Sequence, residues 1–124
     1  MRIDRLDHLV LTVADLRKTI DFYGVLGMRE VTFGYGRKAL EFGRSKINLH
    51  EAGHEFEPKA RQAVPGSADL CFITEDPLDE VIATLQNHDI AILEGPVDRT
   101  GAQGTIRSVY VRDPDGNLVE ISNY

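Results

Sequence analysis

Apolar and polar residues alternate over residues 6–13, and this pattern predicts a β-strand. One face of the strand is apolar, and the other carries His8. Asp15 follows as a candidate N-cap, after which apolar residues recur at helical spacing until Gly24. The chain therefore begins with a strand and a helix.

Three more segments of strand character follow, separated by turns that contain glycine. They cover residues 29–33, 38–42 and 46–51. The first half of the chain thus has the order β-α-β-β-β. Residues 52–67 show no periodicity and are rich in proline, glycine and charge, so we expect a connecting loop there.

The second half of the chain follows the same order. Asp76 and Pro77 are the expected cap and first residue of its helix. A cluster of turn residues at 113–117 lies between two alternating runs, which predicts a β-hairpin. The remaining elements are expected as a strand at 68–74, a short strand at 90–93, a long loop at 94–104 and hairpin strands within 109–121.

The two halves match as an internal repeat. One sequence offset relates Asp15 to Asp76 and also His8 to Asp69, and a larger offset relates His50 to Glu120. The additional residues fit into the long loop. We therefore predict one α+β domain over residues 1–124, made of two βαβββ modules at about 1–51 and 68–124.

Four polar side chains share the sheet face that does not meet the helices. They are His8, His50, Asp69 and Glu120, each on a different strand. Two imidazoles and two carboxylates suit a divalent cation such as Zn, Ni, Fe or Mn. The alternative is a structural role, with hydrogen-bonded histidines and with Asp69 paired to an arginine or a backbone amide.

The amino-acid composition argues against several classes of binding partner and location. The net charge of −6 argues against nucleic acid and against an anionic membrane as the main partner. The sequence shows neither a transmembrane run nor a leader, so we expect a cytoplasmic protein. Cys71 is the only cysteine, which excludes an intrachain disulfide, and we expect it to be a small buried residue.

Four segments carry a resemblance to a known family. They read LDHLVLTV at 6–13, FYGVLGM at 22–28, KINLHE at 46–51 and RDPDGNLVEI at 112–121. The chain resembles the vicinal oxygen chelate superfamily, and within it the small glyoxalase-domain proteins that are similar to lactoylglutathione lyase. The resemblance implies two modules that curl their sheets into an open mixed barrel, and a homodimer.

The resemblance also implies a site. His8, His50 and Glu120 would bind the divalent metal, with Asp69 in the fourth place, and Glu120 or Asp69 would move a proton. This implies a lyase or isomerase acting on a small carbonyl or hydroxy-acid substrate, possibly as a thiol conjugate. The alternatives are a metal-free drug or metabolite binding protein and an extradiol-type dioxygenase, although the iron site of the latter has a histidine where Asp69 stands.

Five basic residues are candidates for binding a carboxylate or a thiol conjugate. They are Arg37, Lys38, Lys59, Arg99 and Arg107, and the alternative for each is simple solvation. Gly101 and Gly104 indicate either a mobile flap over the site or only a turn-rich loop.

Overall fold

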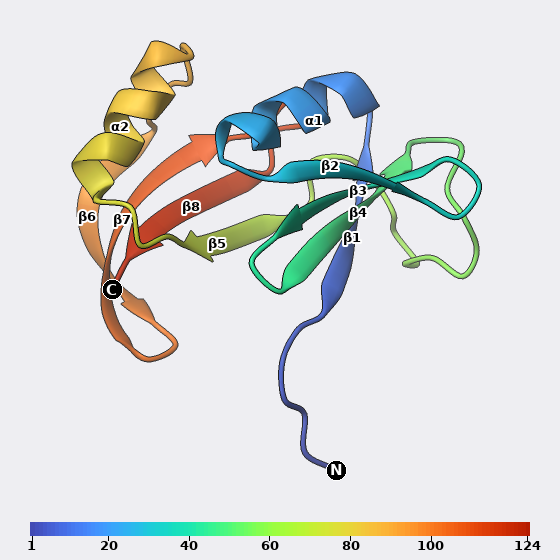
Figure 1. Ribbon diagram of the computed structural model, residues 1–124, viewed down its shortest axis with the longest axis horizontal. Coiled ribbons are helices and arrows are strands. Elements are labelled where there is room, and N and C mark those ends of the chain that lie inside the picture. Colours follow the sequence, from blue (N-terminus) through green and yellow to red (C-terminus); the bar gives the residue numbers. More distant parts are fainter. The chain divides into compact units, whose positions relative to one another are not determined.

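One helix and one four-stranded mixed sheet make up each half of the computed structural model, which describes all of residues 1–124 (Figure 1). The first unit covers Met1–Pro65 and the second covers Gly66–Tyr124. The first contains β1 (His8–Val13), α1 (Leu16–Val25), β2 (Arg29–Phe33), β3 (Arg37–Phe42) and β4 (Ser45–Glu51). The second contains β5 (Asp69–Ile73), α2 (Leu78–Asn87), β6 (Glu94–Gly101), β7 (Gly104–Arg112) and β8 (Leu118–Asn123).

In the first unit the strand order is β1-β4-β3-β2, with β1 parallel to β4 and the other pairs antiparallel. The parallel pair requires the crossover that α1 and β2–β3 provide. Asp15 caps α1, because its Oδ1 accepts a 3.0 Å hydrogen bond from the Lys18 amide. The predicted order of elements and the predicted cap are confirmed.

The core of the first unit forms between the apolar face of the sheet and α1. Val13, Leu40 and Ile47 are fully buried from the sheet, and Tyr23 is fully buried from the helix. These residues alternate with the polar ones along each strand, so burying the apolar side chains leaves the polar side chains on the opposite face.

The second unit repeats this arrangement with strand order β5-β8-β7-β6 and a parallel pair formed by β5 and β8. The predicted turn between β7 and β8 is confirmed. Asp113 Oδ1 accepts hydrogen bonds of 2.9 Å from the amides of Asp115 and Asn117, and Oδ2 accepts one of 2.8 Å from Asn117 Nδ2. This side chain closes the turn and aligns the two strands.

Two expectations between α2 and β7 are wrong. Residues 90–93 form no strand, and the predicted loop at 94–104 is instead β6 and the turn that follows it. The pairing of Gly101 with Gly104 leaves a two-residue hairpin turn. Strand β6 is an exposed edge strand with a bulge between Glu94 and Val97, so it lacks the apolar alternation by which strands are recognised.

The predicted start of the second helix is also wrong by one residue. Pro77 is itself the N-cap, and no side chain caps the helix. Asp76 lies before the helix, where its backbone carbonyl accepts a 2.9 Å hydrogen bond from Asn123 Nδ2. Asp79 and Glu80 in the first turn provide the negative charge that favours a helix N-terminus.

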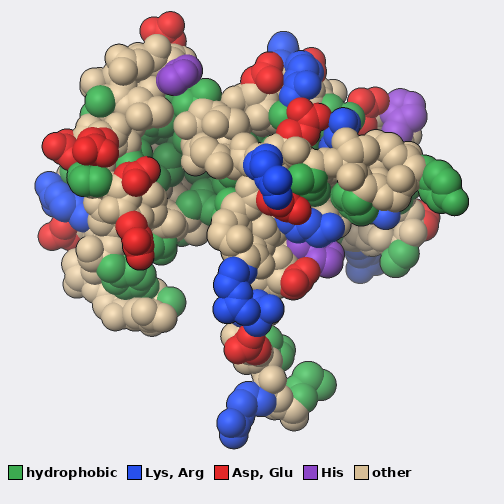
Figure 2. All heavy atoms as spheres, in the orientation of Figure 1, with side chains coloured by type: hydrophobic (Ala, Val, Ile, Leu, Met, Phe, Trp, Pro, Cys, Tyr) green, Lys and Arg blue, Asp and Glu red, His purple; other side chains and the backbone are tan.

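Residues 1–7 precede the first sheet as a segment without secondary structure, and their side chains are exposed (Figure 2). Neither helix of the structure has the length and apolar character needed to cross a membrane.

Candidate metal and substrate site

The polar face of the second sheet carries a connected group of side chains. Its members point away from the apolar core, and they come from three neighbouring strands: Asp69 and Cys71 on β5, Glu120 and Ser122 on β8, and Ser108 and Tyr110 on β7. The register places Cys71 and Tyr110 on either side of Glu120.

Asp69 and Glu120 lie close together on this face. Asp69 pairs with Leu118, two residues before Glu120 on the neighbouring strand. Such diagonal neighbours are about 7–8 Å apart at their Cα atoms, a distance that two carboxylates can bridge by binding one cation. The structure therefore brings these two predicted ligands together within one unit.

Glu120 is held in place by a chain of hydroxyl groups. Ser108 is fully buried, and its Oγ donates a 2.6 Å hydrogen bond to Glu120 Oε1. The Oγ atoms of Ser108 and Ser122 are 2.7 Å apart, and since the hydrogen of Ser108 goes to the carboxylate, Ser122 is the donor of this second bond. Cys71 Sγ lies 3.6 Å from Ser122 Oγ. The chain fixes the rotamer of Glu120 and places a thiol at its far end.

Two groups beside Glu120 have raised pKa values. Burial raises the pKa of the Tyr110 phenol, and this phenol accepts a 3.1 Å hydrogen bond from Arg99 Nε. Burial also raises the pKa of the Cys71 thiol, with a further contribution from the charge of Glu120. Cys71 as a residue is exposed, so the expectation that it is buried is wrong, although its thiol is partly desolvated.

His8 begins β1 on the polar face of the first sheet. Its Nδ1 lies 2.8 Å from Asp7 Oδ2, and its side chain is 45% exposed. A carboxylate at one ring nitrogen orients the ring and directs the other nitrogen, here Nε2, toward a ligand. His8 therefore has the local arrangement of a metal-binding histidine.

His50 lies on the same face but not beside His8. His8 pairs with Lys46, whereas Thr12 pairs with His50, so four residues, or about 13 Å of strand, separate the two imidazoles. His50 is buried, and its Nε2 lies 3.3 Å from a terminal nitrogen of Arg37. The first unit therefore does not bring His8 and His50 together.

The predicted equivalence of His50 and Glu120 is wrong. The parallel registers give Lys46 and Leu118 the same place in their units, since they pair with His8 and Asp69 respectively. Glu120 then corresponds to Asn48, and His50 corresponds to Ser122. Matching the strands by their hydrophobic faces cannot detect this error, because a shift of two residues leaves every side chain on the same face.

Asn48 is the residue that sequence reasoning missed. It is buried, and its Oδ1 has no hydrogen-bond partner. His8 and Asn48 are diagonal neighbours in the first unit, as Asp69 and Glu120 are in the second. An alignment of residues 46–49 with residues 118–121 would have found the correspondence.

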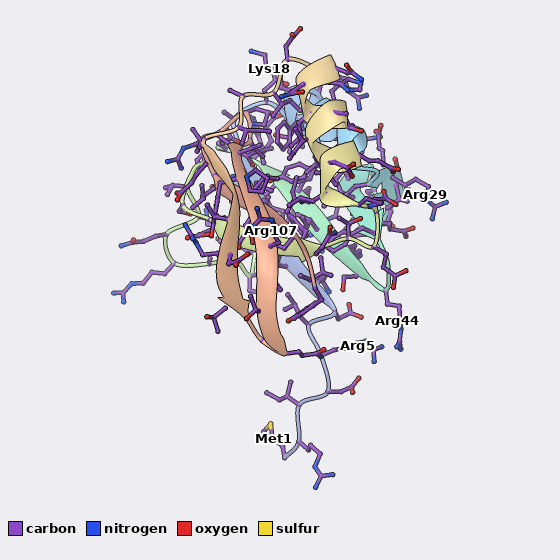
Figure 3. All side chains as sticks on the ribbon, turned by 90° about the vertical axis from the view of Figure 1, so that its left-hand side faces the viewer. Met1, Arg5, Lys18, Arg29, Arg44 and Arg107 are labelled. Atoms are coloured by element: carbon purple, nitrogen blue, oxygen red, sulfur yellow. The ribbon has the colours of Figure 1, made fainter.

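Of the five candidate basic residues, four have acidic partners. The pairs are Lys38 with Glu30 at 3.0 Å, Lys59 with Glu55 at 3.5 Å, Arg99 with Glu94 at 3.0 Å and Arg107 with Asp98 at 2.9 Å. Figure 3 shows Arg107 on β7. Arg37 contacts His50 and two aromatic rings but no carboxylate. Arg37 is therefore the candidate whose charge is left for another molecule.

Comparison with known proteins identifies relatives of this fold. Virulence protein STM3117 of Salmonella typhimurium is 61% identical over the whole chain and 87% of its own length, and its crystal structure superposes with a TM-score of 0.98 over 100% of this chain and 99% of that one. Glyoxalase domain-containing protein RDO1 of Mycosarcoma maydis is 59% identical over 100% of this chain and 70% of its own. Metallothiol transferase FosB of Lysinibacillus sphaericus is 27% identical over 97% and 82%.

The family assignment rests on nearly the full length of the chain. Residues 5–121 match the family described as Glyoxalase/Bleomycin resistance protein/Dioxygenase superfamily. The repeated helix-and-sheet unit is the fold of this family. The chain therefore belongs to the glyoxalase/bleomycin resistance protein/dioxygenase superfamily.

Proposed function

We propose that the protein is a divalent-metal-dependent lyase or isomerase that acts on a small oxygenated substrate. The observation that supports this most directly is the diagonal pair Asp69 and Glu120, with Glu120 fixed by the buried hydroxyl of Ser108. A carboxylate that is oriented in this way is typical of a metal ligand or a catalytic base.

The residues present fit a divalent cation. His8 offers an imidazole that Asp7 orients, Asp69 and Glu120 offer carboxylates, and Asn48 offers an unpartnered amide oxygen. Neither unit alone gathers three His, Cys, Asp or Glu side chains into a metal-binding group. Within the first unit, Asn48 takes the place that the sequence assigned to His50.

When bound, the cation supplies Lewis-acid stabilisation of negative charge on a substrate oxygen. Glu120 is the proposed base that moves a proton at the neighbouring carbon, since Ser108 holds it in one rotamer. The Tyr110 phenol is protonated at neutral pH, as phenols ordinarily are, and burial raises its pKa further. It stands opposite Glu120, where it is the proposed proton donor. These roles suit a proton transfer next to a carbonyl group.

The FosB relative is named a metallothiol transferase, and this name supports a metal-dependent reaction with a thiol-containing substrate. The family description also covers binding proteins and dioxygenases. Asp69 stands where a ferrous dioxygenase would need a histidine, so the ligand set favours a lyase or isomerase over a dioxygenase. A homodimer and a cytoplasmic location remain part of the proposal.

Metal analysis tests this proposal. We expect protein purified without added metal to contain a divalent cation, and we expect His8→Asn, Asp69→Asn and Glu120→Gln each to lose most of it. Glu80→Gln, on the exposed surface of α2, is the matched control and should keep the metal. Full metal content in all three site variants would contradict the proposed site.

Turnover then separates the reaction classes. The metal-loaded protein is assayed with the hemithioacetal of methylglyoxal and glutathione, and with catechol in air. Isomerisation of the hemithioacetal supports the proposal. Oxygen consumption with catechol supports the dioxygenase, and a protein that binds small ligands tightly without metal or turnover is a binding protein.

A further inference from the structure

We propose that Arg37 binds the carboxylate group of the substrate, so that the substrate is a small oxygenated acid. The class of substrate rests on the proposed function, whereas the residues of the carboxylate-binding site all belong to the first unit. It consists of Arg37, Phe33, Phe56 and His50.

The charge of Arg37 is uncompensated within the protein. Its Nε is buried and has no hydrogen-bond partner, and it makes no salt bridge. Arg37 as a whole is half-buried, and a partly buried charge without an opposite charge is costly in free energy, so such groups are normally paired. A bound anion would supply the missing partner.

Two aromatic rings hold the guanidinium of Arg37. Its Cζ lies 5.0 Å from the centre of the Phe33 ring and 4.5 Å from the centre of the Phe56 ring. Rings that contact the face of a guanidinium leave its N–H groups in the plane, where those not bonded to His50 can donate to a planar carboxylate.

His50 contributes orientation without a second positive charge. Its Nε2 lies 3.3 Å from a terminal nitrogen of Arg37, and this contact requires Nε2 to be the acceptor. Phe56 packs edge-on against the His50 ring, with 5.4 Å between the ring centres. Since Nε2 accepts this hydrogen bond, the ring carries its single proton on Nδ1 and adds no positive charge.

The position of Arg37 relates it to the proposed metal donors. Arg37 contacts His50, which lies two residues beyond Asn48 on the same face of β4. Two residues of strand span about 7 Å. A keto or hydroxy acid with its carboxylate a few bonds from the metal-binding oxygen would match this separation.

The test uses the full-length protein freed of metal and labelled with ¹⁵N. Levulinate, a keto acid with two methylene groups between its carbonyl and carboxylate, is titrated while the Arg37 Nε–H resonance is followed. We expect a saturable shift with levulinate and none with its neutral methyl ester. Inorganic phosphate tests the selectivity of the site, because arginine binds phosphates as well as carboxylates. Tighter binding of phosphate than of levulinate would overturn the assignment of a carboxylate site.

Substitutions identify the residue responsible. Arg37→Met should weaken levulinate binding at least about tenfold, which is the loss of one charge-assisted hydrogen bond or more. Arg37→Lys keeps the charge and the long stem, so it serves if the methionine variant fails to fold, and it should also bind weakly. Arg29→Met is the control, because Arg29 is exposed on β2 and paired with Glu41 (Figure 3).

The two proposals fail separately. Unchanged levulinate binding in both Arg37 variants, or equal binding of the methyl ester, would overturn this inference even if the protein binds metal. If levulinate binding depends on Arg37 while the protein purified without added metal contains no divalent cation, this inference is supported and the proposed metal-dependent function is overturned.

Discussion

Ser108 donates a 2.6 Å hydrogen bond to Glu120 Oε1, from the buried centre of β7 to the neighbouring strand β8. The Oγ atom of Ser122 in turn lies 2.7 Å from the Oγ atom of Ser108. A buried hydroxyl with an ionised partner gives a short, strong hydrogen bond and limits the carboxylate to one rotamer. The position of Glu120 therefore depends on a residue that would itself touch neither metal nor substrate.

Ser108→Ala should consequently weaken metal binding. Loss of an outer partner of a metal ligand reduces affinity by about 10–100-fold, and we expect an effect at the lower end. Isothermal titration with Mn²⁺, well below the unfolding temperature, measures it. Ser45→Ala is the control, since its hydroxyl contacts only the Leu6 carbonyl, at 3.3 Å, in the first unit. Equal Mn²⁺ affinity in both variants would show that Ser108 has only a structural role.

The protonation of His50 should make stability depend on pH. Burial, followed by the charge of Arg37, lowers the pKa of His50 below its ordinary value of 6.5. Between the folded pKa and 6.5 the unfolded chain binds more protons, so the free energy of unfolding falls as the pH falls through this range. Above about pH 6.5 this contribution is fully present.

Urea unfolding from pH 5 to pH 8 measures this effect. The carboxylates also titrate toward the acid end of this range, so the contribution of His50 is the difference between the wild type and His50→Gln. We expect the wild type to lose more stability than the variant as the pH falls below 6.5. Parallel curves would mean that His50 is not buried as a neutral ring.

The hydrophobic pattern was sufficient to predict most of the fold. Strands that have one face on the core, such as β1 and β8, alternate clearly and were found. The edge strand β6 has almost no buried side chains, so the same signal is absent. Its pairing with β7 depends on backbone hydrogen bonds, and these do not require any particular pattern of apolar side chains.

The site was predictable in composition but not in register. The sequence places His8, Asp69 and Glu120 on polar faces, and the structure agrees. The position of Asn48 beside His8 depends on which residues of the two parallel strands are paired. A shift of the pairing by two residues leaves the alternation of polar and apolar side chains unchanged, so the sequence pattern cannot reveal it. The isolation of Arg37 was equally hidden, because the ion pairs of Lys38 and Arg107 join separate strands.

Cys71 offers a chemical measure of the charges beside it. Burial raises the pKa of its thiol, and Glu120 and Asp69 raise it further. Only the thiolate reacts with disulfide reagents, so reaction with Ellman's reagent at pH 8 should be slower than that of glutathione.

Removing a neighbouring negative charge should accelerate this reaction. We expect Glu120→Gln to react several-fold faster than the wild type, and Asp69→Asn to show a smaller increase, because Glu120 contributes more to the shift. The control Glu80→Gln should match the wild type. If the rate of Glu120→Gln were the same as that of the control, Glu120 would not lie beside Cys71 as the register places it.

Gly95 supports Ser108 from the neighbouring strand, and its substitution should be costly. Its φ of 115° is unfavourable for other residues, and a Cβ there would lie 2.4 Å from the Ser108 carbonyl oxygen and 2.9 Å from Val109 Cα. Both neighbours are backbone atoms, which cannot move without disturbing β7. Gly95→Ala should therefore lower the free energy of unfolding by at least about 2 kcal/mol.

Gly24→Ala is the matched control for this change. Gly24 lies in α1, and a Cβ there meets no atom within 4 Å. Alanine should therefore stabilise the helix by about 0.5–1 kcal/mol. Opposite signs for the two substitutions, measured by chemical unfolding, are the expected result. If Gly95→Ala left the free energy of unfolding unchanged, β6 would not pack closely against β7 at Ser108. In that case β6 would not help to position Ser108 for its hydrogen bond to Glu120.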